Sequence, residues 1–223
     1  MRPTATSATA QPLDHLLGSP ALVRVIRVLT AHGGGLAVGD LARRARLTLP
    51  STRVAVDRLV EVGLVRTSGV GRSRLCTLEP MHPMADALTR LFAAERAEFD
   101  AVLQALRGAA AADAQRPLGL WLYGSVARGE DGPGSDLDLA AVFDRPEPDV
   151  ADRLRERLAA AAPAYAARLS LVTLGMADVE RLAADDAPFW RALAHDAVVL
   201  HGEAPTTLAA GAGRDVVAPR ADG

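Results

Sequence analysis

Lysine is absent from this sequence of 223 residues, so all 25 of its basic side chains are arginines. Cysteine occurs once, at Cys76, which excludes a disulfide within the chain and gives no sign of an oxidising compartment. No run of roughly 18 uncharged apolar residues is present, and residues 1–20 lack the apolar stretch of a signal peptide. We therefore expect a cytoplasmic protein that does not enter a membrane.

The overall composition is that of a chain that folds. Hydrophobic residues make up 49% of it and charged residues 23%, so the chain can bury a core. Its length suits one large domain or two small ones. The formal net charge of −2 by itself indicates no partner.

Charge is unevenly distributed along the chain. Residues 1–78 hold 11 arginines and 4 acids (net +7), residues 79–116 hold 4 and 6 (net −2), and residues 117–223 hold 10 and 17 (net −7). This asymmetry predicts two domains with different partners. A basic first domain of this size is typical of proteins that bind a polyanion.

Short helices and a hairpin are predicted for residues 18–80, after a flexible N-terminus at 1–17. Apolar residues recur at helical spacing, and turn and N-cap residues gather at 48–52. Two strand-like runs then surround a Gly/Ser/Arg tip. The predicted elements are, in order, helices at 20–31, 38–46 and 53–62, and a hairpin at 64–78.

Three helices followed by an arginine-tipped hairpin resemble the winged helix-turn-helix of bacterial repressors of the ArsR and MarR type. The resemblance implies that the third helix enters the major groove of double-stranded DNA, while the hairpin reaches phosphate or the minor groove. The DNA contacts expected from it are Ser51, Thr52, Arg53 and Arg58 on the helix, and Arg72 and Arg74 on the hairpin. The alternative is a small helical module whose arginines only keep it soluble.

One long helix is predicted at 84–112, inside a linker that spans 81–115. Apolar residues keep helical spacing along its whole length. Repressors of the resembled type dimerise through such a helix, which implies a homodimer that contacts two half-sites on DNA. The same periodicity is equally compatible with packing inside one chain.

The segment with the most specific chemistry lies between residues 118 and 143. A first apolar strand ends at Gly124-Ser125, a Gly- and Pro-rich loop follows, and a second strand starts within Asp136-Leu137-Asp138. Alternate residues of a strand point to the same side, so the two carboxylates share a face. They repel each other unless a cation such as Mg²⁺ lies between them, and the glycine-serine turn lets the backbone approach a phosphate. The pattern predicts a nucleoside triphosphate site.

Gly124-Ser125, ten further residues and then Asp136-x-Asp138 resemble the signature of the DNA polymerase β-like nucleotidyltransferase superfamily, in particular its minimal (MNT-type) members. Tyr123, residues 127–130 and Ser135 also match that pattern. The resemblance implies ATP or another NTP as substrate, with Mg²⁺ or Mn²⁺ held by the two aspartates as the catalytic residues. It also implies contacts to the nucleotide from Gly124, Ser125, Arg128 and Ser135.

Together the two resemblances imply an α/β fold in the broad sense, more narrowly α+β. An N-terminal winged helix-turn-helix and a long linker helix would precede a C-terminal mixed sheet flanked by helices. The transferase domain would span 116–203, before a disordered tail at 204–223.

One carboxylate of the superfamily pattern is missing. A third acid usually stands on a later strand, but in the matching strand at 167–174 the position is Ser170. Serine carries no charge and cannot act as a base at neutral pH. Two functions stay open: NMP transfer to a hydroxyl of a protein or small molecule, or transcriptional regulation by a degenerate domain that senses nucleotide. Since minimal members often accompany a HEPN-type protein, such a protein is a candidate partner.

Overall fold

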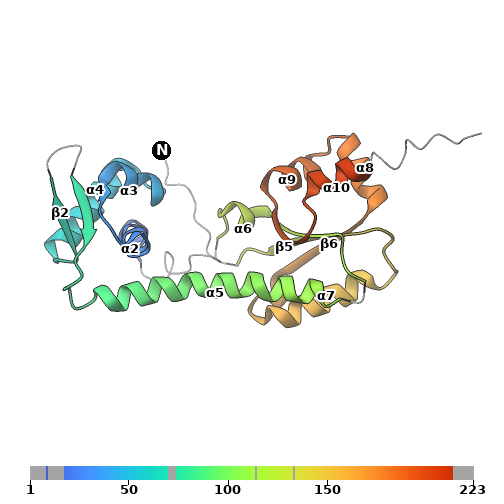
Figure 1. Cartoon of the computed structure of the whole chain (residues 1–223), viewed down its shortest axis with the longest axis horizontal. Coiled ribbons are helices and arrows are strands. Elements are labelled where there is room, and N and C mark those ends of the chain that lie inside the picture. The colour runs from blue at the N-terminus through green and yellow to red at the C-terminus, as the bar shows by residue number, and fades with distance from the viewer. Residues whose placement is uncertain (1–8, 10–17, 70–73, 114, 133, 213–223) are drawn as a thin grey trace, which may run out of the picture. The chain divides into compact units, whose positions relative to one another are not determined.

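The computed structural model describes residue 9 and residues 18–69, 74–113, 115–132 and 134–212. The chain divides into two compact units, Met1–Phe99 and Asp100–Gly223. The boundary falls inside one helix, α5 (Ala85–Ala111), which therefore contributes residues to both units (Figure 1). The predicted mixed α+β class is confirmed.

The N-terminal unit contains three helices and a small antiparallel sheet whose strand order is β1-β3-β2. Its elements are α2 (Pro20–His32), β1 (Leu36–Ala37), α3 (Val38–Arg44), α4 (Leu49–Glu61), β2 (Val65–Ser68) and β3 (Leu75–Leu78). Side chains from all of them form one core around Leu29, Leu41 and Val56. The three helices and the hairpin were predicted. Strand β1 was not, because a two-residue strand leaves no periodic signal and is defined by its pairing of Leu36 with Cys76.

Helix α4 begins four residues before the predicted start at residue 53. Thr48 is the N-cap, and its hydroxyl accepts a hydrogen bond from the Ser51 N–H at 3.3 Å. Pro50 lies in the first turn, where the absence of an N–H costs no helical hydrogen bond. The predicted turn at 48–52 is therefore wrong beyond Thr48, since its proline and hydroxyl residues start the helix.

A buried ion pair attaches the first part of α5 to α2 within the N-terminal unit. Arg27 Nε donates to Glu95 Oε2 at 2.7 Å, and Nη2 donates to Oε1 at 3.1 Å. The guanidinium carbon also lies 5.2 Å from the centre of the Phe92 ring. This half of α5 is therefore part of the core of the N-terminal unit.

The C-terminal unit is built on a four-stranded mixed sheet with the order β6-β5-β4-β7. In chain order it contains β4 (Gly119–Tyr123), α6 (Gly124–Arg128), β5 (Leu137–Phe143), α7 (Val150–Ala161), the 3₁₀ helix η2 (Pro163–Arg168), β6 (Leu169–Gly175), α8 (Met176–Ala184), α9 (Pro188–Asp196), β7 (Val198–Gly202) and α10 (Pro205–Ala212). Strands β5 and β6 are parallel, and α7 and η2 make the crossover between them. Strand β4 pairs antiparallel with β5 and β7.

Helices cover both faces of this sheet. Trp121 of β4 and Ala140 of β5 pack against Trp190 of α9, and the two tryptophan rings meet edge to face at 6.4 Å. Helix α7 lies on the opposite side, as Figure 1 shows, and buries Leu154 and Leu158. The central strand β5 is therefore buried on both faces, and its N-terminal end lies beside the turn that follows β4.

The predicted disordered tail is wrong for residues 205–212. They form helix α10, whose Leu208 and Ala209 pack onto the same core as Trp190. The Ala/Gly/Pro/Thr composition suggested disorder, but Pro205 starts the helix and Leu208 supplies the buried contact. Residues 213–223 lie outside the described residues, as does the predicted flexible N-terminus except for residue 9. None of the described helices has the length and apolar character needed to cross a bilayer.

Candidate nucleotide site and nucleic-acid interface

The turn between β4 and α6 brings the backbone against Asp138. Gly124 has φ +76°, in the left-handed region that side chains rarely adopt. A Cβ atom there would lie 3.2 Å from Cγ of Asp138 and overlap its Oδ2. The glycine therefore allows the backbone of the turn to approach the Asp138 carboxylate directly, so that a ligand of the carboxylate would also lie close to the turn.

Asp136 and Asp138 lie at the N-terminal end of β5. Asp136 precedes the strand, whereas Asp138 is its second residue and is partly buried. Burial, and next the Asp136 carboxylate, raise the pKa of Asp138, while a hydrogen bond from Ser170 and the charge of Arg128 lower it. The effect of Asp136 on this pKa indicates that its carboxylate lies close to that of Asp138. The intervening Leu137 is fully buried, as the alternation predicted.

Ser170 occupies the strand position opposite Asp138. The parallel ladder of β5 and β6 pairs Asp138 with Ser170, and the serine side chain is hydrogen bonded to the aspartate. Residues 167 and 168, which the sequence assigned to this strand, belong to η2. Throughout the part of the chain that the structure describes, no group of three or more His, Cys, Asp or Glu side chains is placed to hold a metal ion. The site therefore offers two carboxylates and a neutral hydroxyl.

This donor set fits a hard divalent cation. Oxygen ligands from two carboxylates are those that Mg²⁺ prefers, and it keeps further positions for water and phosphate oxygens. The Gly124 turn lies directly against the Asp138 carboxylate, so phosphate oxygens of a ligand bound to the ion would lie near the backbone of this turn. Asp136 and Asp138 are the residues that could hold the ion.

Arg128 and Ser135, both predicted to contact nucleotide, are engaged within the protein. Arg128 Nε donates to Glu130 at 2.9 Å, and its Nη1 lies 3.6 Å from Asp196 at the end of α9. The hydrogen bond to Glu130 is the main cause that raises the pKa of Arg128. Ser135 Oγ accepts a hydrogen bond from the Gly132 N–H at 3.0 Å. Both side chains fix the loop between α6 and β5.

Arg168 was not predicted and holds the same loop from the other side. Its Nη1 donates to the Ser135 carbonyl at 3.2 Å, and its guanidinium lies 5.5 Å from the Tyr165 ring. It therefore fixes the backbone directly before Asp136. An arginine in front of a strand carries no sequence signal for this role, because the contact joins residues 33 positions apart.

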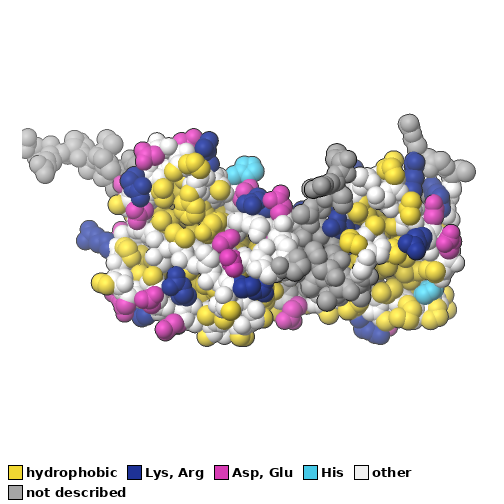
Figure 2. Space-filling view, turned by 180° about the vertical axis from the view of Figure 1, so that it is seen from behind, with side chains coloured by type: hydrophobic (Ala, Val, Ile, Leu, Met, Phe, Trp, Pro, Cys, Tyr) yellow, Lys and Arg dark blue, Asp and Glu magenta, His cyan; other side chains and the backbone are white. Residues whose placement is uncertain are grey.

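Most other acids of the C-terminal unit have an arginine partner. On the face seen in Figure 2, acidic and basic side chains are interspersed over this unit. Examples are Arg153–Glu147 at 2.9 Å, Arg155–Asp152 at 3.5 Å, Arg181–Asp178 at 3.0 Å and Arg191–Asp186 at 3.8 Å. The net charge of −7 is therefore not a continuous acidic surface. What distinguishes Asp136 and Asp138 is that they are neighbouring acids with no ion-pair partner among the described residues.

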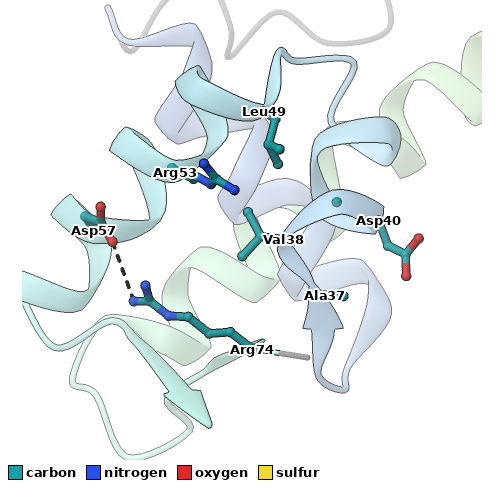
Figure 3. Close-up of a pocket in the computed structure, with 8 residues that line it drawn as sticks. Ala37, Val38, Asp40, Leu49, Arg53, Asp57 and Arg74 are labelled. Atoms are coloured by element: carbon teal, nitrogen blue, oxygen red, sulfur yellow. Dashed lines mark hydrogen bonds and ion pairs between the residues drawn. The ribbon is translucent and has the colours of Figure 1, made fainter. Parts of the chain in front are cut away.

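In the N-terminal unit, α4 is an exposed ridge between two grooves. One groove, of about 700 Å³, is lined by Arg53 and Asp57 of α4 and by Arg74 before β3 (Figure 3). The other, of about 370 Å³, lies between α4 and the start of α2 and includes Val54 and Arg58. A helix that stands out between grooves in this way has the shape required to enter a major groove.

The residues predicted to contact DNA differ in exposure. Ser51, Arg53 and Arg58 are exposed on α4. Thr52 is fully buried, and its hydroxyl donates to the Thr48 carbonyl at 2.9 Å. The prediction for Thr52 is therefore wrong, because the earlier start of the helix turns this side chain into the core.

On the hairpin, Arg74 is 38% exposed and lies 3.5 Å from Asp57, whereas Arg72 lies outside the described residues. Sequence reasoning missed Val54, whose 61% exposure on the ridge is unusual for an apolar side chain. Helical periodicity identified the buried stripe of this helix. An apolar residue at a position outside that stripe was the sequence signal that could have identified Val54 as an exposed surface residue.

Comparison with protein families gives two matches. Residues 104–172 match the model of a nucleotidyltransferase domain, and residues 22–69 match that of an IclR helix-turn-helix domain. The first match includes the Gly124 turn, both aspartates and Ser170; the second runs from α2 to β2. No curated protein matches this chain. The narrower MNT and ArsR/MarR assignments stay predictions.

Proposed function

We propose that this chain, in which a helix-turn-helix domain is joined to a nucleotidyltransferase domain, binds double-stranded DNA and transfers NMP from an NTP to an acceptor hydroxyl. One observation supports the transfer half: the Gly124 turn lies against the carboxylate of Asp138, whose charge interacts with that of Asp136. Double-stranded DNA and NTP are both found in the cytoplasm, where we place the protein.

The residues of the proposed site have separate tasks. Asp136 and Asp138 would hold Mg²⁺, or Mn²⁺ in its place. The ion, when bound, supplies positive charge that neutralises the triphosphate and polarises the phosphorus under attack. The backbone N–H groups at Gly124 and Ser125, with the Ser125 hydroxyl, donate to terminal phosphate oxygens. Arg128, Ser135 and Arg168 keep the intervening loop in position.

The reaction is a displacement at phosphorus. The acceptor oxygen forms a bond to the α-phosphorus while the bond between that phosphorus and the bridging oxygen of the β-phosphate breaks, and pyrophosphate leaves with that electron pair. The acceptor proton passes to solvent water, because Ser170 cannot take it. Catalysis in such a site is mainly positioning and charge stabilisation.

Ser170 favours a second function. Its hydroxyl is hydrogen bonded to Asp138 at the position where the superfamily pattern has a third carboxylate. A domain without this acid can bind nucleotide and turn it over slowly or not at all. The chain would then be a transcriptional regulator whose affinity for DNA responds to nucleotide.

The DNA half of the proposal uses α4 and the hairpin. Ser51, Arg53 and Arg58 would approach base edges and phosphates from the ridge, and Arg74 would reach phosphate from the adjoining groove. Arg72 completes the proposed set on the hairpin. A homodimer through α5 would present two such ridges, and Leu91, 40% exposed on that helix, offers apolar surface for it.

The test incubates the full chain with Mg²⁺ and with each NTP in turn, labelled at the α-phosphate. The candidate acceptors are the chain itself, small-molecule alcohols and a HEPN-type protein. Asp138→Asn should abolish label transfer. Asp152→Asn, which removes an exposed acid on α7, should leave it intact. Nucleotide binding without transfer by the wild type would select the sensing function, and no binding at all would reject both.

A further inference from the structure

Asp57 places a carboxylate on the ridge that we propose to face DNA. Its side chain is 59% exposed at the middle of α4. A negative charge directed at a phosphate backbone weakens binding to every sequence alike. We therefore expect a neighbouring side chain to compensate for the negative charge of Asp57.

One arginine contacts this carboxylate, and a second arginine lines the same groove. Arg74 Nη2 lies 3.5 Å from Asp57 Oδ1 across the groove, as the dashed line in Figure 3 shows. Arg53, one turn earlier on α4, lines the same groove, and among the described residues it has no ion-pair partner. Asp57 is therefore paired with Arg74, whereas Arg53 is left without an ion-pair partner among the described residues.

The other acid in this groove is directed elsewhere. Asp40 is paired with Arg43 at 2.8 Å, and in Figure 3 its carboxylate points away from the pair formed by Asp57 and Arg74. Asp57 is therefore the acid of this groove whose negative charge acts on Arg74.

We propose that Asp57 is a specificity-determining residue of the DNA interface. On unrelated sequence it retains Arg74 and repels phosphate, which keeps binding weak. At the correct site its carboxylate accepts a hydrogen bond from a base amino group, N4 of cytosine, and Arg74 moves to a phosphate. Since an ion pair this exposed is weak, the exchange needs little energy. This inference rests on the DNA-binding half of the proposed function.

The experiment compares wild type with Asp57→Asn on two duplexes of 25 base pairs, one scrambled and one selected by the wild type from a random pool. Affinity is measured by fluorescence anisotropy between 50 and 300 mM salt. We expect Asp57→Asn to bind the scrambled duplex about 5- to 10-fold more tightly at 100 mM salt, with the log–log salt slope steeper by about 1. Its preference for the selected duplex should fall by about 10-fold or more.

Two further variants separate this role from a general effect of charge. Glu61→Gln removes the same charge one turn along α4, outside the groove, and should produce less than half of the gain on scrambled DNA. In Asp57→Asn/Arg74→Gln the gain should disappear, because the released cation is gone. Asp57 and Glu61 are both exposed, so the fold tolerates either change, which far-ultraviolet circular dichroism verifies.

Equal gains from Asp57→Asn and Glu61→Gln, or an unchanged preference for the selected duplex, would overturn the role of Asp57 and leave DNA binding standing. A wild type that binds neither duplex would overturn both proposals.

Discussion

In the N-terminal unit the acid that faces a proposed anionic ligand is paired with an arginine, whereas in the C-terminal unit the corresponding acid has a second acid as its neighbour. Asp57 lies 3.5 Å from Arg74 in an exposed groove. Asp138 is partly buried beside Asp136 and Ser170, and burial and the neighbouring carboxylate raise its pKa.

The two arrangements call for opposite ligands. An acid paired with arginine is already neutralised, so a phosphate can compete for the arginine and release the acid. Two neighbouring acids at the end of a central strand, with no ion-pair partner among the described residues, favour a divalent ion, and through that ion they bind an anion. Both units therefore use carboxylates to approach a polyanion, but only the second needs a metal for it.

The largest effect is expected at the turn that lies against the Asp138 carboxylate. Gly124→Ala should reduce both Mg·ATP binding and label transfer by about 100-fold, because the new methyl group displaces Asp138 and the positive φ adds strain. Isothermal titration calorimetry and the labelling assay measure the two losses. Gly132→Ala is the matched control, since a Cβ at Gly132 meets nothing within 4 Å. Equal behaviour of the two variants would remove the argument that the turn forms the site.

A buried acid that is paired with an arginine should contribute to folding stability, unlike the exposed Asp57. Glu95 is 4% exposed and bonded to Arg27, so Glu95→Gln should lower the free energy of unfolding of the N-terminal unit by about 3 kcal/mol. Both tryptophans, Trp121 and Trp190, belong to the C-terminal unit, so their fluorescence should report an unchanged transition while circular dichroism reports the loss. Glu98→Gln, an exposed change on the same helix, should have no effect on either signal. A shift in the fluorescence transition of Glu95→Gln would contradict the assignment of this ion pair to one unit.

Supplying the missing acid should convert the carboxylate pair into a stronger metal site. Ser170→Asp puts a third carboxylate opposite Asp138, and we expect Mn²⁺ affinity or transfer rate to rise by about 10- to 100-fold. Electron paramagnetic resonance of free Mn²⁺ gives the affinity without any turnover. Ser170→Ala, which removes the hydrogen bond and adds no charge, should give no such gain. If Ser170→Asp matches Ser170→Ala in both measurements, the hydroxyl is not what limits the site.

Local patterns predicted most of the fold and the centre of the nucleotide site. Helical spacing located α2, α3 and α5 to within a few residues, and the Gly124 and Asp138 positions followed from a motif within one short stretch of chain. Strand β1 and the Arg168 contact were missed because each depends on a partner tens of residues away.

Errors at α4 and α10 have a different cause, since both helices start with residues that also form turns. Pro50 and Pro205 each lie in the first turn of a helix. From composition alone, these prolines were interpreted as residues that prevent a helix from forming. The false DNA contact at Thr52 followed directly, because a helix that starts earlier presents a different face. The pairing of Asp57 with Arg74 could not be predicted, since it needs the distance between helix and hairpin.

The smallest effect concerns an acid that is paired mainly with backbone. Asp178 accepts a hydrogen bond from the Gly175 N–H at 3.1 Å at the start of α8, and this contact, followed by Arg181, lowers its pKa. Asp178→Ala should therefore cost about 0.5–1 kcal/mol of stability at pH 7, a modest loss because the side chain is 46% exposed. Because the folded pKa lies below the ordinary value near 3.9, this contribution is complete above about pH 4 and is lost as the pH falls through the folded pKa. Urea unfolding followed by tryptophan fluorescence at several pH values measures the difference from wild type. Glu180→Ala, an exposed change on the same helix, should show little loss at any pH, and a loss for Asp178→Ala that grew on acidification would contradict the assignment.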